Sequence, residues 1–201
     1  MYEYRGDGWH VSAQSHGQML LALYFRDLAG IEHPGPPDIA PLAPRVKATA
    51  AAEVCGPPAA ELRQEWHDWW RRVLVQGPED DGLFSPPAFP GFADSPTLQR
   101  LLQAHYGAAL SWSRARMIEY TEVSAEHHGS GRRGLLEQMI TDRAMELERR
   151  PKPMELKLVE LPLSEPRAWF VDPDTVILSQ DLARDADLYR SFLEPVIRFL
   201  L

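Results

Sequence analysis

Cysteine is almost absent from this 201-residue chain, which contains only Cys55. A single cysteine excludes an internal disulfide and a cysteine-rich metal cage, and it is typical of a reducing compartment. Long apolar runs are absent too, because the densest run, residues 19–25, is far shorter than the roughly 20 residues that cross a bilayer. Met1 is not followed by a secretory leader pattern. We therefore expect a cytoplasmic protein with no membrane partner.

Positive charge is also scarce. Lys and Arg number 21 against 29 Asp and Glu, which gives a net charge of −8. Surfaces that bind nucleic acid use Lys and Arg to displace counterions from phosphates, so we expect no nucleic-acid partner. Arg far outnumbers Lys, and Ala and Pro are frequent, a bias typical of GC-rich bacterial genomes. The sequence thus indicates an acidic bacterial protein.

The remaining composition is that of an ordinary globular protein, with 44% hydrophobic and 25% charged residues. This length supports one good core, so we predict a single domain over residues 1–201. Proline-rich loops should cover residues 33–58 and 77–96, because closely spaced prolines prevent a long helix. The first loop could instead present its Pro-x-x-Pro at 41–44 as a polyproline ligand.

The C-terminal fifty residues carry the clearest pattern of structure. Apolar and charged residues alternate over 154–163 and predict a strand. The apolar positions change parity at Val159, which requires either a bulge or a strand whose second face also becomes covered. A turn at 164–166 and a returning strand over 169–178, interrupted at 172–174, would complete a hairpin. A final helix, capped by Asp185 or Asp187, carries an apolar stripe.

We therefore predict an α+β fold, a mostly helical single domain with a small antiparallel sheet from this C-terminal ββα unit. A hairpin at residues 2–11 could extend the sheet. A helix capped by Ser12 or Ser15 should end near Gly30. A helix over 59–75 should bury its three tryptophans in the core, although an aromatic box that binds a cation would show a similar sequence pattern. Residues 96–127 form one helix or two pieces that break near Gly107, and another helix covers 135–149.

Polar residues within the apolar face of the 96–127 helix are the candidate site. His105 and Arg116 lie on that face and Glu119 lies at its margin, and these three are the candidate catalytic residues. Polar residues in an apolar stripe are informative, because burying each one unpaired would cost a few kcal/mol. A helical bundle with inward Glu and His can also hold a metal. The chain lacks Glu-x-x-His and His-Glu-x-x-His, so we predict no cofactor and keep a metal site as the alternative. Its candidate ligands are Glu122, Glu126, His127 and His128.

Three phenylalanines lie between prolines in the second loop: Phe84, Phe89 and Phe92. Exposed rings in a flexible loop would favour aggregation, so they must be covered. Either the loop folds back onto the core, or these rings bind a partner protein.

The sequence favours a non-catalytic binding or accessory protein of the bacterial cytoplasm, such as a subunit, adaptor or inhibitor, whose partner is another protein. It contains no nucleophile motif, metal signature or nucleotide loop, and its proline-rich loops carry apolar anchors. The alternative is an enzyme with an unrecognised Glu/His site, with or without a metal. Neither the partner nor the oligomeric state follows from the sequence.

Overall fold

The computed structural model describes residues 1–32, 35–49, 59–76, 84–129, 131–148 and 153–201, without the side chains at 59, 76, 126–129, 132 and 133. These residues divide into two compact units. Unit 1 contains Met1–Ser15 and Ile118–Leu201, and unit 2 contains His16–Met117. The single domain stays a prediction, because this division does not show whether either unit folds alone.

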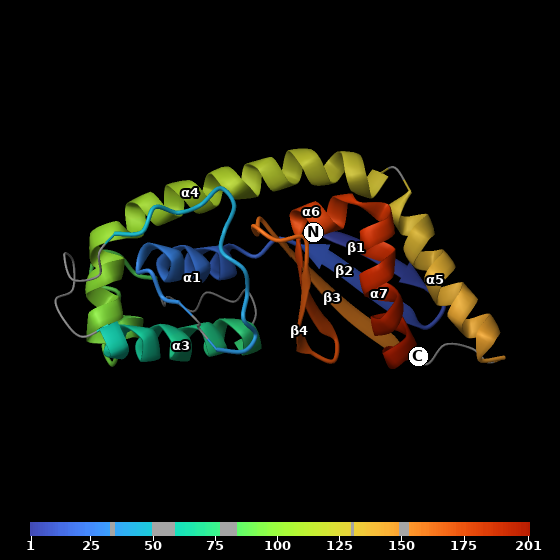
Figure 1. The fold of residues 1–201 in the computed structure, drawn as a ribbon, viewed down its shortest axis with the longest axis horizontal. Coiled ribbons are helices and arrows are strands. Elements are labelled where there is room, and N and C mark those ends of the chain that lie inside the picture. The colour runs from blue at the N-terminus through green and yellow to red at the C-terminus, as the bar shows by residue number, and fades with distance from the viewer. Residues whose placement is uncertain (33–34, 50–58, 77–83, 130, 149–152) are drawn as a thin grey trace. The chain divides into compact units, whose positions relative to one another are not determined.

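Unit 1 contains a five-stranded sheet whose strands come from both ends of the chain (Figure 1). The strand order is β1-β2-β3-β5-β4. The three middle strands are parallel, and β1 and β4 pair antiparallel to their neighbours. The fold is therefore α+β, as predicted, but its sheet is mixed and is not confined to a C-terminal ββα unit. The strands are β1 (Tyr2–Gly6), β2 (Trp9–Gln14), β3 (Met154–Leu161), β4 (Ala168–Asp172) and β5 (Thr175–Ser179).

The pairing of β3 corrects the predicted hairpin. Strand β3 pairs parallel with β5 and not with β4. The predicted turn sequence separates two strands, because β4 ends at Asp172, residues 173–174 form the turn, and β5 then pairs with β4. The parity change at Val159 involves no bulge, because β3 pairs in continuous register with β2 and β5. Every residue of β3 from Leu158 onward is buried. A strand buried on both faces belongs inside a sheet with a partner on each side.

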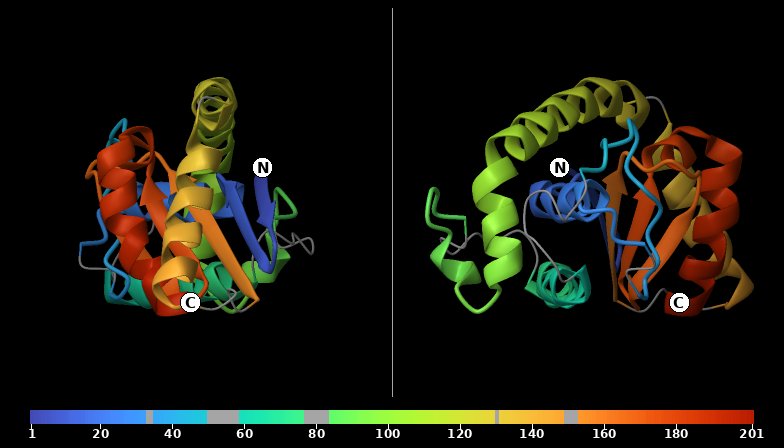
Figure 2. Two further views of the ribbon diagram at one scale, coloured as in Figure 1. Left: turned by 90° about the vertical axis from the view of Figure 1, so that its right-hand side faces the viewer. Right: turned by 60° about the vertical axis from the view of Figure 1, so that its left-hand side comes forward.

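Helices α5 (Arg132–Glu146) and α7 (Ala186–Leu200) lie against one face of this sheet (Figure 2). The short helix α6 (Gln180–Arg184) directly follows β5. Asp185 caps α7 as predicted, because its carboxylate accepts hydrogen bonds from two backbone N–H groups, both at 3.0 Å. The α7 stripe is buried at its centre, where Leu193 is fully covered, and the core of unit 1 is largely aliphatic.

Unit 2 is helical and has an aromatic core. It contains α1 (Gly17–Leu28), α3 (Ala59–Gln76), the 3-10 turn η1 (Pro90–Phe92) and the first part of α4 (Pro96–Gly129), which continues into unit 1 without a break at Gly107. The indole N–H of Trp66 donates to the carbonyl of Ala22 at 2.7 Å and thereby ties α3 to α1. Core packing of the α3 tryptophans is confirmed, since Trp66, Trp69 and Trp70 are all at most 1% exposed.

The cap of α1 differs from the prediction. His16 is the N-cap residue, and its Nδ1 accepts a hydrogen bond from the backbone N–H of Met19 at 3.2 Å. Neither predicted serine is the N-cap residue. Ser12 belongs to β2, which ends at Gln14, and Ser15 directly precedes the N-cap His16. Burial lowers the pKa of His16, which favours the neutral ring that an acceptor nitrogen requires.

The described part of the first proline-rich loop is anchored on α1. Arg26, only 3% exposed, donates to the carbonyls of Ile39 at 2.6 Å and Ala40 at 2.9 Å. Asp27 accepts from the backbone N–H of Leu42 at 2.8 Å. Leu42 belongs to the Pro-x-x-Pro and is fully buried, so its side chain already has partners within unit 2.

Candidate functional site

The predicted catalytic residues are spread along α4. His105 is half-buried, and its Nε2 has no hydrogen-bond partner among the described residues. The guanidinium of Arg116 lies 5.5 Å from the ring centre of Trp112, and Glu119 is exposed. His105 and Arg116 are separated by about 16 Å along the helix, at ~1.5 Å per residue. Arg116 and Glu119 are one helical turn apart, whereas His105 lies too far along α4 to join them, and a catalytic role for any of the three stays a prediction.

Three of the four predicted metal ligands are beyond what the structure tests. Glu122 is exposed on α4, and the side chains of Glu126, His127 and His128 lie outside the described residues. In the part of the chain that the structure describes, no three His, Cys, Asp or Glu side chains gather as a metal site. The metal site on α4 therefore stays a prediction.

The phenylalanines of the second loop are buried within unit 2. Phe84 and Phe92 contact the ring of Trp69, with centroid distances of 5.8 and 5.3 Å, and Phe89 contacts Tyr106 at 5.0 Å. Their exposed fractions are 9% for Phe84 and 1% for the other two. This packing supports the interpretation that the loop folds back onto the core. A partner-binding role for Phe84, Phe89 and Phe92 stays a prediction.

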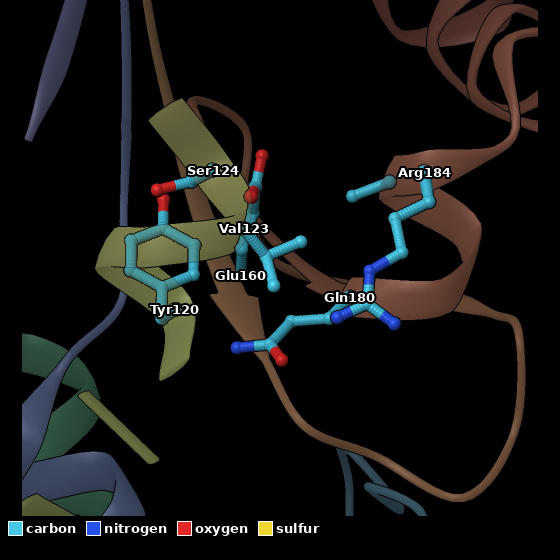
Figure 3. A pocket seen from close by; sticks show the side chains of 7 residues that line it. Tyr120, Val123, Ser124, Glu160, Gln180 and Arg184 are labelled. Atoms are coloured by element: carbon cyan, nitrogen blue, oxygen red, sulfur yellow. The ribbon is translucent and has the colours of Figure 1, made fainter. Parts of the chain in front are cut away.

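A small polar pocket in unit 1 was not predicted from the sequence (Figure 3). Its cavity of about 20 Å³ has room for a single water-sized group. We call it the polar pocket. The lining side chains come from α4, the end of β3 and α6, and they are Tyr120, Val123, Ser124, Glu160, Gln180, Ala183 and Arg184.

The topology of the sheet explains the position of the polar pocket. Glu160 is the last residue but one of β3, and Gln180 directly follows the end of β5. Strands β3 and β5 are parallel, so their carboxyl ends reach the same edge of the sheet. Ligands of open sheets with parallel strands commonly bind outside these ends. The polar pocket thus lies where such a sheet offers a binding site.

The polar pocket holds several buried polar groups. Glu160 is 3% exposed and Tyr120 is 6% exposed. Burial, followed by the negative charge of Glu160, raises the pKa of Tyr120, so this phenol is neutral near pH 7. The hydroxyl of Ser124 donates to that of Tyr2 at 3.1 Å. The Tyr120 hydroxyl and Gln180 Nε2 are both buried, and neither makes a well-formed hydrogen bond to any described protein atom.

Sequence reasoning missed Glu160 because the apolar pattern changes just before it. Met154, Leu156, Leu158 and Glu160 share one parity, and the first three lie in the core beneath α5 and α7. A carboxylate at the fourth position of a core-facing series is the signal that could have identified it. Buried charges need partners or a functional reason.

A second candidate site is a groove between α5 and α7. These helices run parallel, because Arg190 bonds Gln138 at 3.2 Å and Arg198 bonds Glu146 at 3.3 Å, and both pairs are 52 residues apart. The groove has a volume of about 130 Å³. We call it the charged groove. Its lining consists of two apolar residues, three acids and three arginines, namely Met139, Ile197, Asp142, Glu146, Glu194, Arg143, Arg190 and Arg198.

Ion pairs cross the charged groove, and two of its lining residues are followed or preceded in sequence by exposed apolar residues. Glu146 accepts from Arg143 at 3.0 Å as well as from Arg198, and Arg198 also pairs with Glu194 at 3.0 Å. Met145 and Phe199 adjoin the Glu146–Arg198 pair in sequence and are 69% and 78% exposed. The groove is thus lined mainly by paired charges, and the helices that form it also carry two large exposed apolar side chains.

Comparison of the chain with models of protein families, with curated proteins and with solved structures finds no match. Among the described helices, none is long and apolar enough to span a bilayer.

Proposed function

We propose that this chain is a non-catalytic binding or accessory protein whose partner is another protein. The observation that carries the proposal is the exposure of Met145 and Phe199 on α5 and α7, the two helices that form the charged groove. Exposed Met and aromatic side chains on helices that also carry arginines are typical of protein interfaces, where these residue types are enriched.

The charges of the groove define the chemistry of the partner. Three arginines and three acids line the groove together with Met139 and Ile197. A surface of this kind favours a partner that presents both carboxylates and basic groups around an apolar side chain, because each charge then meets its opposite. A uniformly basic partner would be attracted by the whole acidic chain but would be repelled locally by the arginines.

Replacement of the two exposed apolar side chains by serine tests this proposal. Met145→Ser with Phe199→Ser should abolish capture of the partner, which the wild-type chain would retain, while the melting temperature stays unchanged because both residues are exposed. Phe170→Ser is the matched control, since Phe170 is 57% exposed on β4, away from the groove residues in sequence. The captured protein must then bind the purified wild-type chain directly, with affinity at least tenfold weaker for the double variant. Equal binding by all three chains would remove the groove from the proposal.

An enzyme is the second candidate function. The position of the polar pocket at the carboxyl ends of β3 and β5, with the buried carboxylate of Glu160, favours it. Elemental analysis of the purified chain separates the two candidates most cheaply. Stoichiometric zinc, iron or manganese would favour the enzyme and the predicted ligands Glu122, Glu126, His127 and His128.

A further inference from the structure

We infer that the polar pocket is a binding site for a single neutral hydroxyl group, either a water molecule or the terminal hydroxyl of a small polyol. This inference is independent of the proposed partner surface. It rests on the size of the cavity, on two buried polar atoms that make no well-formed hydrogen bond within the described residues, and on the charges that surround them.

Size limits the occupant to one small group. A water molecule needs a cavity of roughly 10–15 Å³ or more, together with two to four polar partners. The polar pocket has about 20 Å³, which is enough for one oxygen atom with its hydrogens and too small for a whole metabolite. Only the end of a larger molecule could enter it.

The two buried atoms favour an occupant that can accept a hydrogen bond, since the Tyr120 hydroxyl, which lies near Glu160, can donate or accept. Tyr120 is 6% exposed, and its hydroxyl has no well-formed hydrogen bond within the described residues. The same holds for Gln180 Nε2, which can only donate. Leaving such groups unsatisfied in the interior is costly, so an acceptor between α4 and α6 would stabilise the fold.

The charges exclude an ion as the occupant. An anion would meet the carboxylate of Glu160, which is 3% exposed and therefore poorly screened. A cation would meet the N–H groups of Gln180 and the guanidinium of Arg184, which also line the pocket. A neutral hydroxyl accepts from Gln180 and Tyr120 and donates its own hydrogen to Glu160, whose two oxygens offer about four acceptor positions. It is the group that satisfies all three side chains at once.

A crystal structure of the full chain at high resolution tests the site directly. We expect one ordered oxygen within about 2.6–3.2 Å of Tyr120 Oη and of Gln180 Nε2. A second data set from crystals grown with glycerol distinguishes the two sources, because a glycerol hydroxyl at the same position identifies a polyol end and an unchanged water identifies water. A cavity without density, or a direct Tyr120–Glu160 hydrogen bond that closes it, would overturn the inference.

A double-mutant cycle in solution gives an independent test. Tyr120→Phe and Gln180→Leu each remove one donor, and the described structure shows no hydrogen bond between them. If one oxygen bridges them, the two changes should be coupled by a factor of about three or more in the unfolding equilibrium constant. The matched control pairs Tyr120→Phe with Gln138→Leu, which removes an exposed Gln that bonds Arg190, and should be additive. Additive effects in both cycles would contradict a shared hydroxyl.

Discussion

Units 1 and 2 differ in the share of aromatic side chains in their interiors. The interior of unit 2 contains a cluster of rings, which includes Trp66, Trp69, Phe89 and Phe92, beside buried leucines. The interior of unit 1 is mostly aliphatic, with Tyr4, Trp9 and Tyr189 among its buried residues and with buried polar groups at one end of the parallel strands. Unit 2 is continuous in sequence, whereas unit 1 needs both ends of the chain. The polar and charged candidate sites of this protein both lie in the unit whose core is aliphatic.

The largest effect should come from breaking the aromatic core of unit 2. Phe89→Ser with Phe92→Ser replaces two rings that are 1% exposed, and each loss of a buried ring costs about 3–5 kcal/mol. We therefore expect unfolding at ambient temperature or a very large drop in melting temperature, measured by circular dichroism. Phe199→Ser is the control with the same change at an exposed position, and it should leave the melting temperature nearly unchanged. Comparable melting temperatures for both variants would show that these rings are not core residues.

A smaller effect should follow from removing a carboxylate that caps α4 from another helix. Glu65 of α3 accepts from the backbone N–H groups of Thr97 at 3.4 Å and Leu98 at 2.6 Å. Such charge-assisted caps contribute about 1–2 kcal/mol, so Glu65→Ala should lower the free energy of unfolding by that amount. Chemical denaturation measures it. Glu61→Ala, on the exposed side of the same helix, should change the free energy by less than about 0.5 kcal/mol.

The smallest effect concerns pH and the cap of α1. Burial lowers the pKa of His16 below its usual 6.5, so the folded chain binds fewer protons at this site than the unfolded chain in the window just below pH 6.5. Its stabilising contribution is therefore complete above pH 6.5 and declines as the pH falls. His16→Asn keeps a capping acceptor without a titrating group and should flatten this decline, by roughly 1 kcal/mol or less between about pH 7.5 and pH 5. Identical pH profiles of the two chains in urea denaturation would contradict the cap.

Local signals in the sequence predicted much of the secondary structure. The cap of α7 at Asp185, the stripe around Leu193, the tryptophan-bearing helix and the start of α4 at Pro96 all follow from neighbouring residues, and the structure confirms them. The sheet order could not be predicted in the same way. Alternation over 154–161 indicates a strand, but it does not specify which strand is its neighbour. The paired residues Trp9 of β2 and Met154 of β3 are 145 positions apart in the chain.

The candidate site was missed for a related reason. The sequence drew attention to polar residues on one helix, His105, Arg116 and Glu119, of which His105 is distant from the other two. Glu160, Tyr120 and Gln180 come from three separate elements: the pairing of β3 with β5 brings Glu160 near Gln180, and α4 adds Tyr120 to the same pocket. Periodicity describes one element at a time and therefore cannot identify a site assembled from several.

Native-state hydrogen exchange of the full-length Leu193→Ala variant tests the distinction between the two interiors most directly. Leu193 is fully buried in the core of unit 1, so the change should lower the protection of the amides in β2, β3 and β5 by about 2–5 kcal/mol. Amides of α1 and α3, whose core is the aromatic cluster of unit 2, should keep the wild-type protection. An equal loss of protection in α1, α3 and the sheet would contradict separate interiors and would support the single cooperative domain that the sequence predicted.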